Sequence, residues 1–189
     1  SNVDEQDSYI KAAESKGYKV LLLDSPIVPH LIQKLESKKE NISFARVDSD
    51  SIDNLIKKED NIISKLDDKE KDKLKTYIEE VIPKEKYTIQ LEALDSKELP
   101  FIITQPEFMR RMKDMQQSGG NNMFGSMPEI HNVIINVNND LVNTIFNSKS
   151  KAKRERLIKQ SLDLARLSQN LLKGEELTSF IKRSFDIIK

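Results

Sequence analysis

Apolar residues along this chain form short clusters with two different spacings, and this pattern restricts the fold more than any other feature. Between residues 87 and 137 the clusters are short runs typical of β-strands. In the last fifty residues they recur every three or four positions, as in α-helices. Charged residues make up 33% of the 189, which favours helices with one buried and one charged face. The sequence therefore predicts an α+β fold.

The first fifty residues predict a small α/β unit. Helical patterns over 4–16 and 29–35 alternate with apolar runs at 18–23 and 42–47. Such runs are typical of buried strands, and a helix between two parallel strands makes a right-handed crossover. We therefore expect the first fifty residues to form a small α/β unit.

Residues 49–189 predict a larger domain of helices and a three-stranded sheet that ends in a helical bundle. The residues at 87–93 alternate between apolar and polar, and we expect a half-buried antiparallel strand there. The expected strands are 87–93, 100–104 and 130–137, and the expected helices are 52–66, 74–82, 141–146, 157–172 and 177–188.

The last two helical segments carry apolar residues on two sides. Two antiparallel helices bury only part of such a surface, whereas four helices, two from each of two copies, would bury all of it. The sequence therefore predicts a homodimer through its C-terminal helices. The alternative is that these helices pack back onto the strands of their own chain. The expected interface residues are Leu162, Leu171, Leu177, Phe180, Ile181, Ser184 and Ile188.

All five methionines lie between residues 109 and 127, together with three of the five glycines. A short amphipathic helix over 108–115 precedes a glycine-rich stretch. Methionine is unbranched and polarizable, so methionine-rich surfaces accept apolar partners of many shapes. The alternative is a core helix in which methionines fill gaps. We expect an exposed, adaptable binding surface formed by Phe108, Met109, Met112, Met115, Met123 and Phe124.

The sequence carries no motif for catalysis or for metal binding. The chain has no cysteine, which excludes disulfides, Cys-ligated zinc and a thiol nucleophile. It has neither a glycine-rich phosphate loop nor a nucleophile elbow, and neither His30 nor His131 has metal-ligand spacing. No apolar run approaches the roughly 20 residues that cross a bilayer. We therefore expect no catalytic residue, cofactor, metal or membrane partner.

Two alternative functions come from other features. Basic side chains at Arg110 and Arg111 and at 149–156 would suit a scaffold that binds nucleic acid or acidic protein. Equal numbers of basic and acidic residues, 31 each, argue against a dedicated nucleic-acid binder. A small-molecule enzyme would need a pocket near Asp24 and Val47, at the carboxyl ends of the two expected N-terminal strands.

Several segments resemble one known family. Residues 16–23 (KGYKVLLL) are similar to a segment late in the middle domain of the bacterial ninety-kilodalton heat-shock chaperones, HtpG. Residues 108–113 (FMRRMK), 127–138 (MPEIHNVIINVN) and 180–184 (FIKRS) resemble the C-terminal domain of that family. The order and the spacing agree along nearly the whole chain.

The resemblance implies that residues 1–48 end the middle domain and that residues 49–189 form the C-terminal dimerisation domain. It implies part of an ATP-driven chaperone of the bacterial cytoplasm. In that family ATP and magnesium bind an N-terminal domain, and a catalytic arginine lies earlier in the middle domain, so no ATPase activity is expected here. The chain opens at Ser1 without a methionine, and we expect a piece of a longer protein.

The resemblance also implies partners and residues that contact them. The expected partners are a second copy of the chain and unfolded or partly folded client proteins. The implied client contacts are His30 and Gln33, together with Met109, Met112 and the neighbouring apolar residues.

Overall fold

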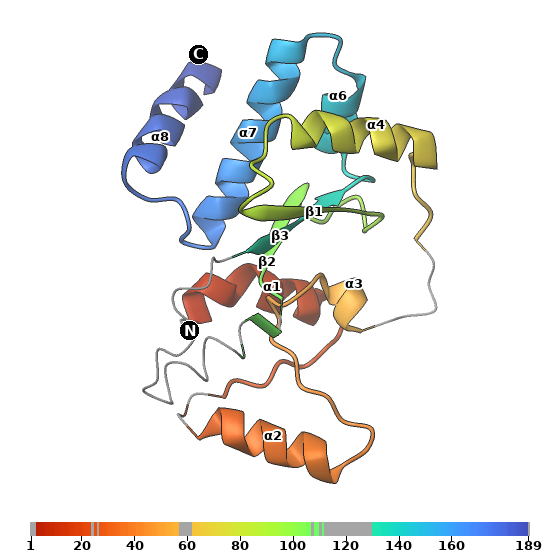
Figure 1. Cartoon of the computed structure of the whole chain (residues 1–189), viewed down its shortest axis with the longest axis vertical. Coiled ribbons are helices and arrows are strands. Elements are labelled where there is room, and N and C mark those ends of the chain that lie inside the picture. The colour runs from red at the N-terminus through yellow and green to blue at the C-terminus, as the bar shows by residue number, and fades with distance from the viewer. Residues whose placement is uncertain are drawn as a thin grey trace.

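The computed structural model describes residues 3–23, 25, 27–56, 62–106, 108–109, 111 and 130–188. Figure 1 shows a small sheet between two layers of helices, with α2 set apart beyond the lower layer. In chain order the elements are α1 (Val3–Ser15), α2 (Val28–Lys38), α3 (Ile52–Leu55), α4 (Asp68–Glu79), β1 (Tyr87–Glu92), β2 (Phe101–Thr104), β3 (His131–Asn136), α6 (Asp140–Asn147), α7 (Lys151–Ser168) and α8 (Gly174–Ile188). The predicted α+β class is confirmed.

The sheet has the order β1-β3-β2, with β3 in the centre. β2 runs antiparallel to β3 and places Phe101 opposite Ile135, whereas β1 runs parallel to β3 and places Tyr87 beside His131. The expectation of an antiparallel strand at 87–93 was therefore wrong. Alternating apolar residues indicate that one face of a strand is buried, but they say nothing about the direction of the neighbouring strand.

Helices α4, α6 and α7 cover one face of the sheet, and α1 and α3 lie against the other (Figure 1). Successive side chains of a strand point to opposite faces. Val133 and Ile135 therefore join the main core on the side of α7, while Ile134 points to the side of α1; all three are fully buried. The main core also contains Leu74, Ile78, Ile82, Tyr87, Ile89, Phe101, Ile103, Val137, Val142, Ile145, Ile158 and Leu162.

The two strands expected at 18–23 and 42–47 are not formed. Both segments are irregular, and Leu21 is 72% exposed, with Leu22, Leu23 and Ile42 also open to solvent. A parallel strand buried on both faces needs neighbouring strands and helices to cover it. Within the described residues no strand pairs with either segment, so the first fifty residues contribute helices α1 and α2 instead of an α/β unit.

The helix expected at 52–66 is much shorter in the structure. It ends after one turn as α3, residues 57–61 lie outside the described part of the chain, and residues 62–66 are irregular. The next helix, α4, begins inside the charged stretch because Asp67 caps it: its carboxylate accepts from the backbone N–H of Glu70, whose side chain accepts from the N–H of Asp67 in return. The helices expected in the last fifty residues are confirmed as α6, α7 and α8.

Candidate association surfaces

The two C-terminal helices form an antiparallel pair beside the sheet (Figure 1). Helix α7 packs on the sheet through Ile158, Leu162 and Ala165, which are buried in the main core. Helix α8 contacts α7 through polar side chains, and Phe180, on the same side of α8, is buried. These links are Gln160 to Ser184 and Arg183, Asp163 to Arg183, and Arg166 to Glu176.

Apolar side chains remain exposed on both helices of this pair. Leu164 and Leu167 are exposed on α7, and Ile181 and Phe185 are exposed on α8, where Phe185 is 63% exposed. Positions 181 and 185 are one helical turn apart, so they share a face, and Leu177, half-buried, precedes them by one more turn. This stripe along α8 (Leu177, Ile181 and Phe185) is the candidate association surface.

The seven expected interface residues occupy different environments. Leu162 and Phe180 are already buried within the chain, whereas Ile181 is exposed. Leu171, Leu177 and Ser184 are half-buried, and the side chain of Ile188 lies outside the described part. The sequence reasoning missed Leu164, Leu167 and Phe185, although their spacing of three or four residues was a usable signal.

A second candidate surface brings α2 and the segment at 108–111 together. The guanidinium group of Arg111 donates to both carboxylate oxygens of Glu36 on α2, at 2.9 and 3.0 Å, and to the carbonyl oxygen of Phe44 at 2.7 Å. The backbone N–H of Phe44 donates to the same carboxylate at 2.8 Å. These hydrogen bonds lower the pKa of Glu36 to about 2, and the bond from Arg111 has a larger effect than the bond from Phe44.

The Arg111–Glu36 ion pair joins two segments that carry several of the expected client contacts. Phe108 is 70% exposed and Met109 is half-buried, while His30 and Gln33 are exposed on α2 beside the exposed Leu31. Met112, Met115, Met123, Phe124 and Arg110 lie outside the described residues.

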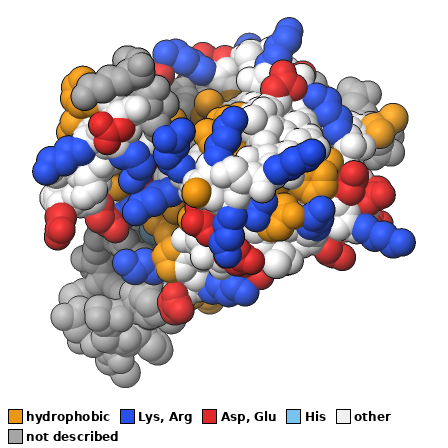
Figure 2. Space-filling view, turned by 90° about the horizontal axis from the view of Figure 1, so that it is seen from above, with side chains coloured by type: hydrophobic (Ala, Val, Ile, Leu, Met, Phe, Trp, Pro, Cys, Tyr) orange, Lys and Arg blue, Asp and Glu red, His pale blue; other side chains and the backbone are white. Residues whose placement is uncertain are grey.

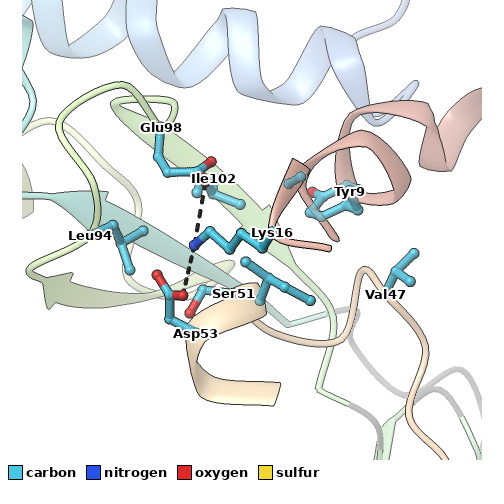
Figure 3. Close-up of a pocket in the computed structure, with 10 residues that line it drawn as sticks. Tyr9, Lys16, Val47, Ser51, Asp53, Leu94, Glu98 and Ile102 are labelled. Carbon is cyan, nitrogen blue, oxygen red and sulfur yellow. Dashed lines mark hydrogen bonds and ion pairs between the residues drawn. The ribbon is translucent and has the colours of Figure 1, made fainter. Parts of the chain in front are cut away.

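A small pocket lies between α1, α3 and the sheet, and Val47 is one of its walls (Figure 3). Inside it the ammonium group of Lys16 lies 2.6 Å from Asp53 and 3.5 Å from Glu98. The cavity measures about 30 Å³, whereas pockets for small organic ligands measure roughly 300–1,000 Å³. The remaining cavity is large enough only for water, and the Lys16 side chain that lines it is paired with Asp53 and Glu98. It does not support a small-molecule active site; Asp24, the other residue named for such a site, lies outside the described part.

The basic run at 149–156 is engaged with its own chain at several points. Ser150 caps α7 by accepting from the N–H of Lys153, and Lys151 lies 3.0 Å from Glu80. The guanidinium carbon of Arg154 lies 3.7 Å from the ring centre of Tyr77, a cation–π contact. On the face drawn in Figure 2, Lys and Arg side chains are interspersed with Asp and Glu. This mixture argues against a continuous nucleic-acid surface there.

The described residues contain no group of three or more His, Asp or Glu side chains placed to hold a metal ion. None of their helices combines the length and the apolar character that a membrane span requires.

Comparison with known proteins relates the chain to one group of chaperones. No protein-family model matches it. It is 31% identical to the chaperone protein HtpG of Bacteroides thetaiotaomicron over 256 aligned positions, which cover all of this chain and 38% of the relative. HtpG of Bacteroides fragilis strain 638R is 30% identical with the same coverage. HtpG of Porphyromonas gingivalis strain W83 is 36% identical over 175 positions, covering 90% of this chain and 25% of the relative.

The class to which the chain is related is therefore that of molecular chaperones. The resemblance to the HtpG family is confirmed, and the chain is a homologue of part of an HtpG chaperone. It spans 38% or less of the length of these relatives. The first alignment, at 256 positions, is longer than the chain of 189 residues, so that relative carries additional residues within the matched region.

Proposed function

We propose that this chain is the self-association and client-binding part of an HtpG-type chaperone, corresponding to the end of the middle domain and the C-terminal dimerisation domain. Nucleotide binding and hydrolysis would belong to other parts of the chaperone, and its place would be the bacterial cytoplasm. In this proposal the C-terminal helices join two copies. Because the C-terminal helices would hold the two chains together, any further association between these chains would be intramolecular and would occur at a high effective concentration.

The observation that carries the proposal is the apolar stripe on α8 in a chain homologous to HtpG. Ile181 and Phe185 are large apolar side chains on one helix face, and they are 45% and 63% exposed. Burying each against a second copy contributes about 1.5–3 kcal/mol. A stable interface would remove roughly 1,200 Å² or more from solvent. Leu164 and Leu167 on α7 supply further apolar surface for it.

Sedimentation equilibrium at micromolar concentration tests self-association. We expect twice the monomer mass of 21.8 kDa for the unchanged chain, and the monomer mass for Ile181→Asp combined with Phe185→Asp. The control is Ile63→Asp, which puts one aspartate in place of an apolar residue that is 86% exposed but lies in the irregular segment before α4. An unchanged chain that stays monomeric throughout would refute self-association.

The client-binding half of the proposal is supported by the surface around α2. Phe108 and Leu31 are exposed apolar residues on segments that the Arg111–Glu36 pair links. Several weak apolar contacts would hold an unfolded chain reversibly and with little sequence preference.

Suppression of aggregation of a chemically denatured client tests this half. We expect Phe108→Asp with Leu31→Asp to reduce the suppression severalfold, with the circular dichroism spectrum and the dimer mass unchanged. Ile63→Asp again serves as the control, because it changes an exposed apolar residue elsewhere. Equal suppression by all three proteins would place the client surface elsewhere.

A further inference from the structure

A buried carboxylate lies at the contact between α7 and α8. The Asp163 side chain is 7% exposed, and its two oxygens are held by different helices. Arg166, one turn further along α7, lies 3.1 Å from one oxygen. Arg183 of α8 lies 2.5 Å from the other and donates through Nε to Gln160 at 2.9 Å. Gln160 in turn donates to Ser184 at 2.9 Å.

The same network continues to the beginning of α8. Arg166 pairs with Glu176 in the first turn of α8 as well as with Asp163. Polar links therefore hold α8 near both of its ends, and Phe180, on the same helix face between them, is buried. The side chains of Asp163, Arg166 and Arg183 are each less than one fifth exposed, so solvent screens their charges only weakly.

We infer that Asp163, Arg166 and Arg183 form an ionic clamp that fixes the rotation of α8, so that its apolar stripe faces a second copy of the chain. This inference rests on the proposed function, since it assigns the residues that orient the proposed association surface.

The argument starts from the two apolar sides of α8. Phe180 is buried and shares a helix face with Glu176 and Arg183, which bond to α7, whereas Ile181 and Phe185 are exposed. Residues 180 and 181 lie about 100° apart around a helix, because an α-helix has 3.6 residues per turn. A helix held to its neighbour by apolar packing alone could rotate by that angle, bury Ile181 in place of Phe180, and remove the stripe from the surface.

The ion pairs between α7 and α8 make this rotation unfavourable. A buried ion pair adds little net stability compared with apolar packing, but a buried charge without its partner is strongly unfavourable. Turning α8 by about 100° would withdraw Arg183 from Asp163 and from Gln160. The clamp therefore selects one rotation of α8. Its contribution is to the orientation of α8.

The test compares Arg183→Met with Lys182→Met. Both remove one positive charge from neighbouring positions of α8. The side chain of Lys182 is exposed, whereas the change at Arg183 keeps an apolar stem and leaves Arg166 to neutralise Asp163. Two quantities are measured for each protein: the dissociation constant for self-association by sedimentation, and amide hydrogen exchange in residues 174–188.

We expect Arg183→Met to weaken self-association at least tenfold and to accelerate exchange in α8, with exchange in β1 and β3 unchanged. Lys182→Met should change the dissociation constant by less than twofold, and Arg183→Lys should restore part of the affinity. Equal behaviour of the two methionine variants in both measurements would overturn the clamp. An unchanged chain that is monomeric would refute the proposed self-association, and the exchange data would still decide whether Arg183 holds α8.

Discussion

The hydroxyl group of Tyr9 on α1 donates a hydrogen bond to the carbonyl oxygen of Ile103 on β2, 94 residues further along the chain. Both residues are buried. Two further bonds join the same regions: Gln6 donates to the carboxylate of Asp48 at 3.1 Å, and the N–H of Gln105 donates to the carbonyl oxygen of Asp48 at 3.2 Å. Helix α1 is thus bonded to the edge strand β2, and α7 packs on the other face of the sheet.

Replacing Tyr9 by Phe should destabilise the protein by about 1–2 kcal/mol, because the carbonyl oxygen of Ile103 loses its buried donor. Burial first, and the charge of Asp48 second, raise the pKa of Tyr9 above its ordinary value. The stabilisation by the Tyr9 hydroxyl group is therefore complete below about pH 10, the ordinary tyrosine pKa. It is lost as pH rises further, because Tyr9 loses its proton at a lower pH in the unfolded chain than in the folded chain.

Urea unfolding of the two proteins between pH 7 and 11 measures this effect. The stability difference between the unchanged chain and Tyr9→Phe should shrink above pH 10. Burial also raises the pKa of Tyr87, but Tyr87 is present in both proteins and cancels in the difference. A difference that stays constant to pH 11 would contradict a buried, bonded hydroxyl group.

The parts of the fold that could be read from the sequence are those in which one element buries one face against the sheet. Helices α6 and α7 are of this kind, and the spacing of their apolar residues reports directly which side is buried. The central strand β3 is buried on both faces, and its continuous apolar run at 133–135 was the signal that predicted it. The run at 18–23 shows where this reasoning fails. Leucine at 21, 22 and 23 is typical of a central strand, yet a strand needs neighbours, and the described residues provide none.

Part of the candidate site could not be predicted because its residues are polar and act in pairs. Asp163 and Arg183 are twenty residues apart, and nothing in their spacing distinguishes them from the other charges of α7 and α8. Lys16 is likewise one of many lysines until the fold places Asp53 and Glu98 beside it. The exposed apolar residues of α8 were more accessible to sequence reasoning, since a second apolar side on a helix is visible in its periodicity.

Replacing Lys16 by Met should cost about 1–3 kcal/mol, since Asp53 and Glu98 would keep their charges without a cation. The Lys16 side chain is 18% exposed, and one oxygen of Asp53 is buried without a hydrogen-bond partner even in the unchanged chain. Lys11→Met, on the helix α1 that ends just before Lys16, is the matched control: Lys11 lies 2.8 Å from Asp7 but is 72% exposed. Its loss should leave the urea midpoint nearly unchanged, because a solvent-exposed ion pair is strongly screened. Equal urea midpoints for the two variants would show that the Lys16 pair is no stronger than a surface pair.

Replacing Asn138 by Asp should destabilise the protein by about 3 kcal/mol, because a carboxylate cannot donate, so two carbonyl groups would lose a donor and face a negative charge instead. The buried amide of Asn138 donates to the carbonyl oxygens of Ile63 and Leu94, at 3.0 and 3.1 Å, and accepts from the N–H of Lys65 at 2.8 Å.

The same change at an exposed asparagine controls for added charge. Asn147 ends α6 and donates to the carbonyl oxygen of Asn143 at 2.9 Å. Asn147→Asp should cost less than about 1 kcal/mol, mostly from the helix dipole. Thermal unfolding of both variants provides the comparison, and a loss at Asn138 no larger than at Asn147 would mean that the buried amide does not join residues 63–65 to the end of β3.

Removing Arg111 should raise the pKa of Glu36 from about 2 toward the ordinary glutamate value of about 4.3. The rise should be incomplete, because the N–H of Phe44 still donates to the carboxylate in Arg111→Met. A carboxylate with a lowered pKa stabilises the folded arrangement above its unfolded pKa, and this stabilisation is lost as pH falls toward about 2. The link between α2 and the segment at 108–111 should therefore hold at neutral pH and weaken in acid.

The carboxyl carbon resonance of Glu36, followed by NMR against pH, measures the shift. Arg46→Met removes a nearby arginine that pairs with Asp48, and it should leave the Glu36 titration unchanged. If Arg111→Met also left it unchanged, Arg111 would not be the partner that joins these two parts of the proposed client surface.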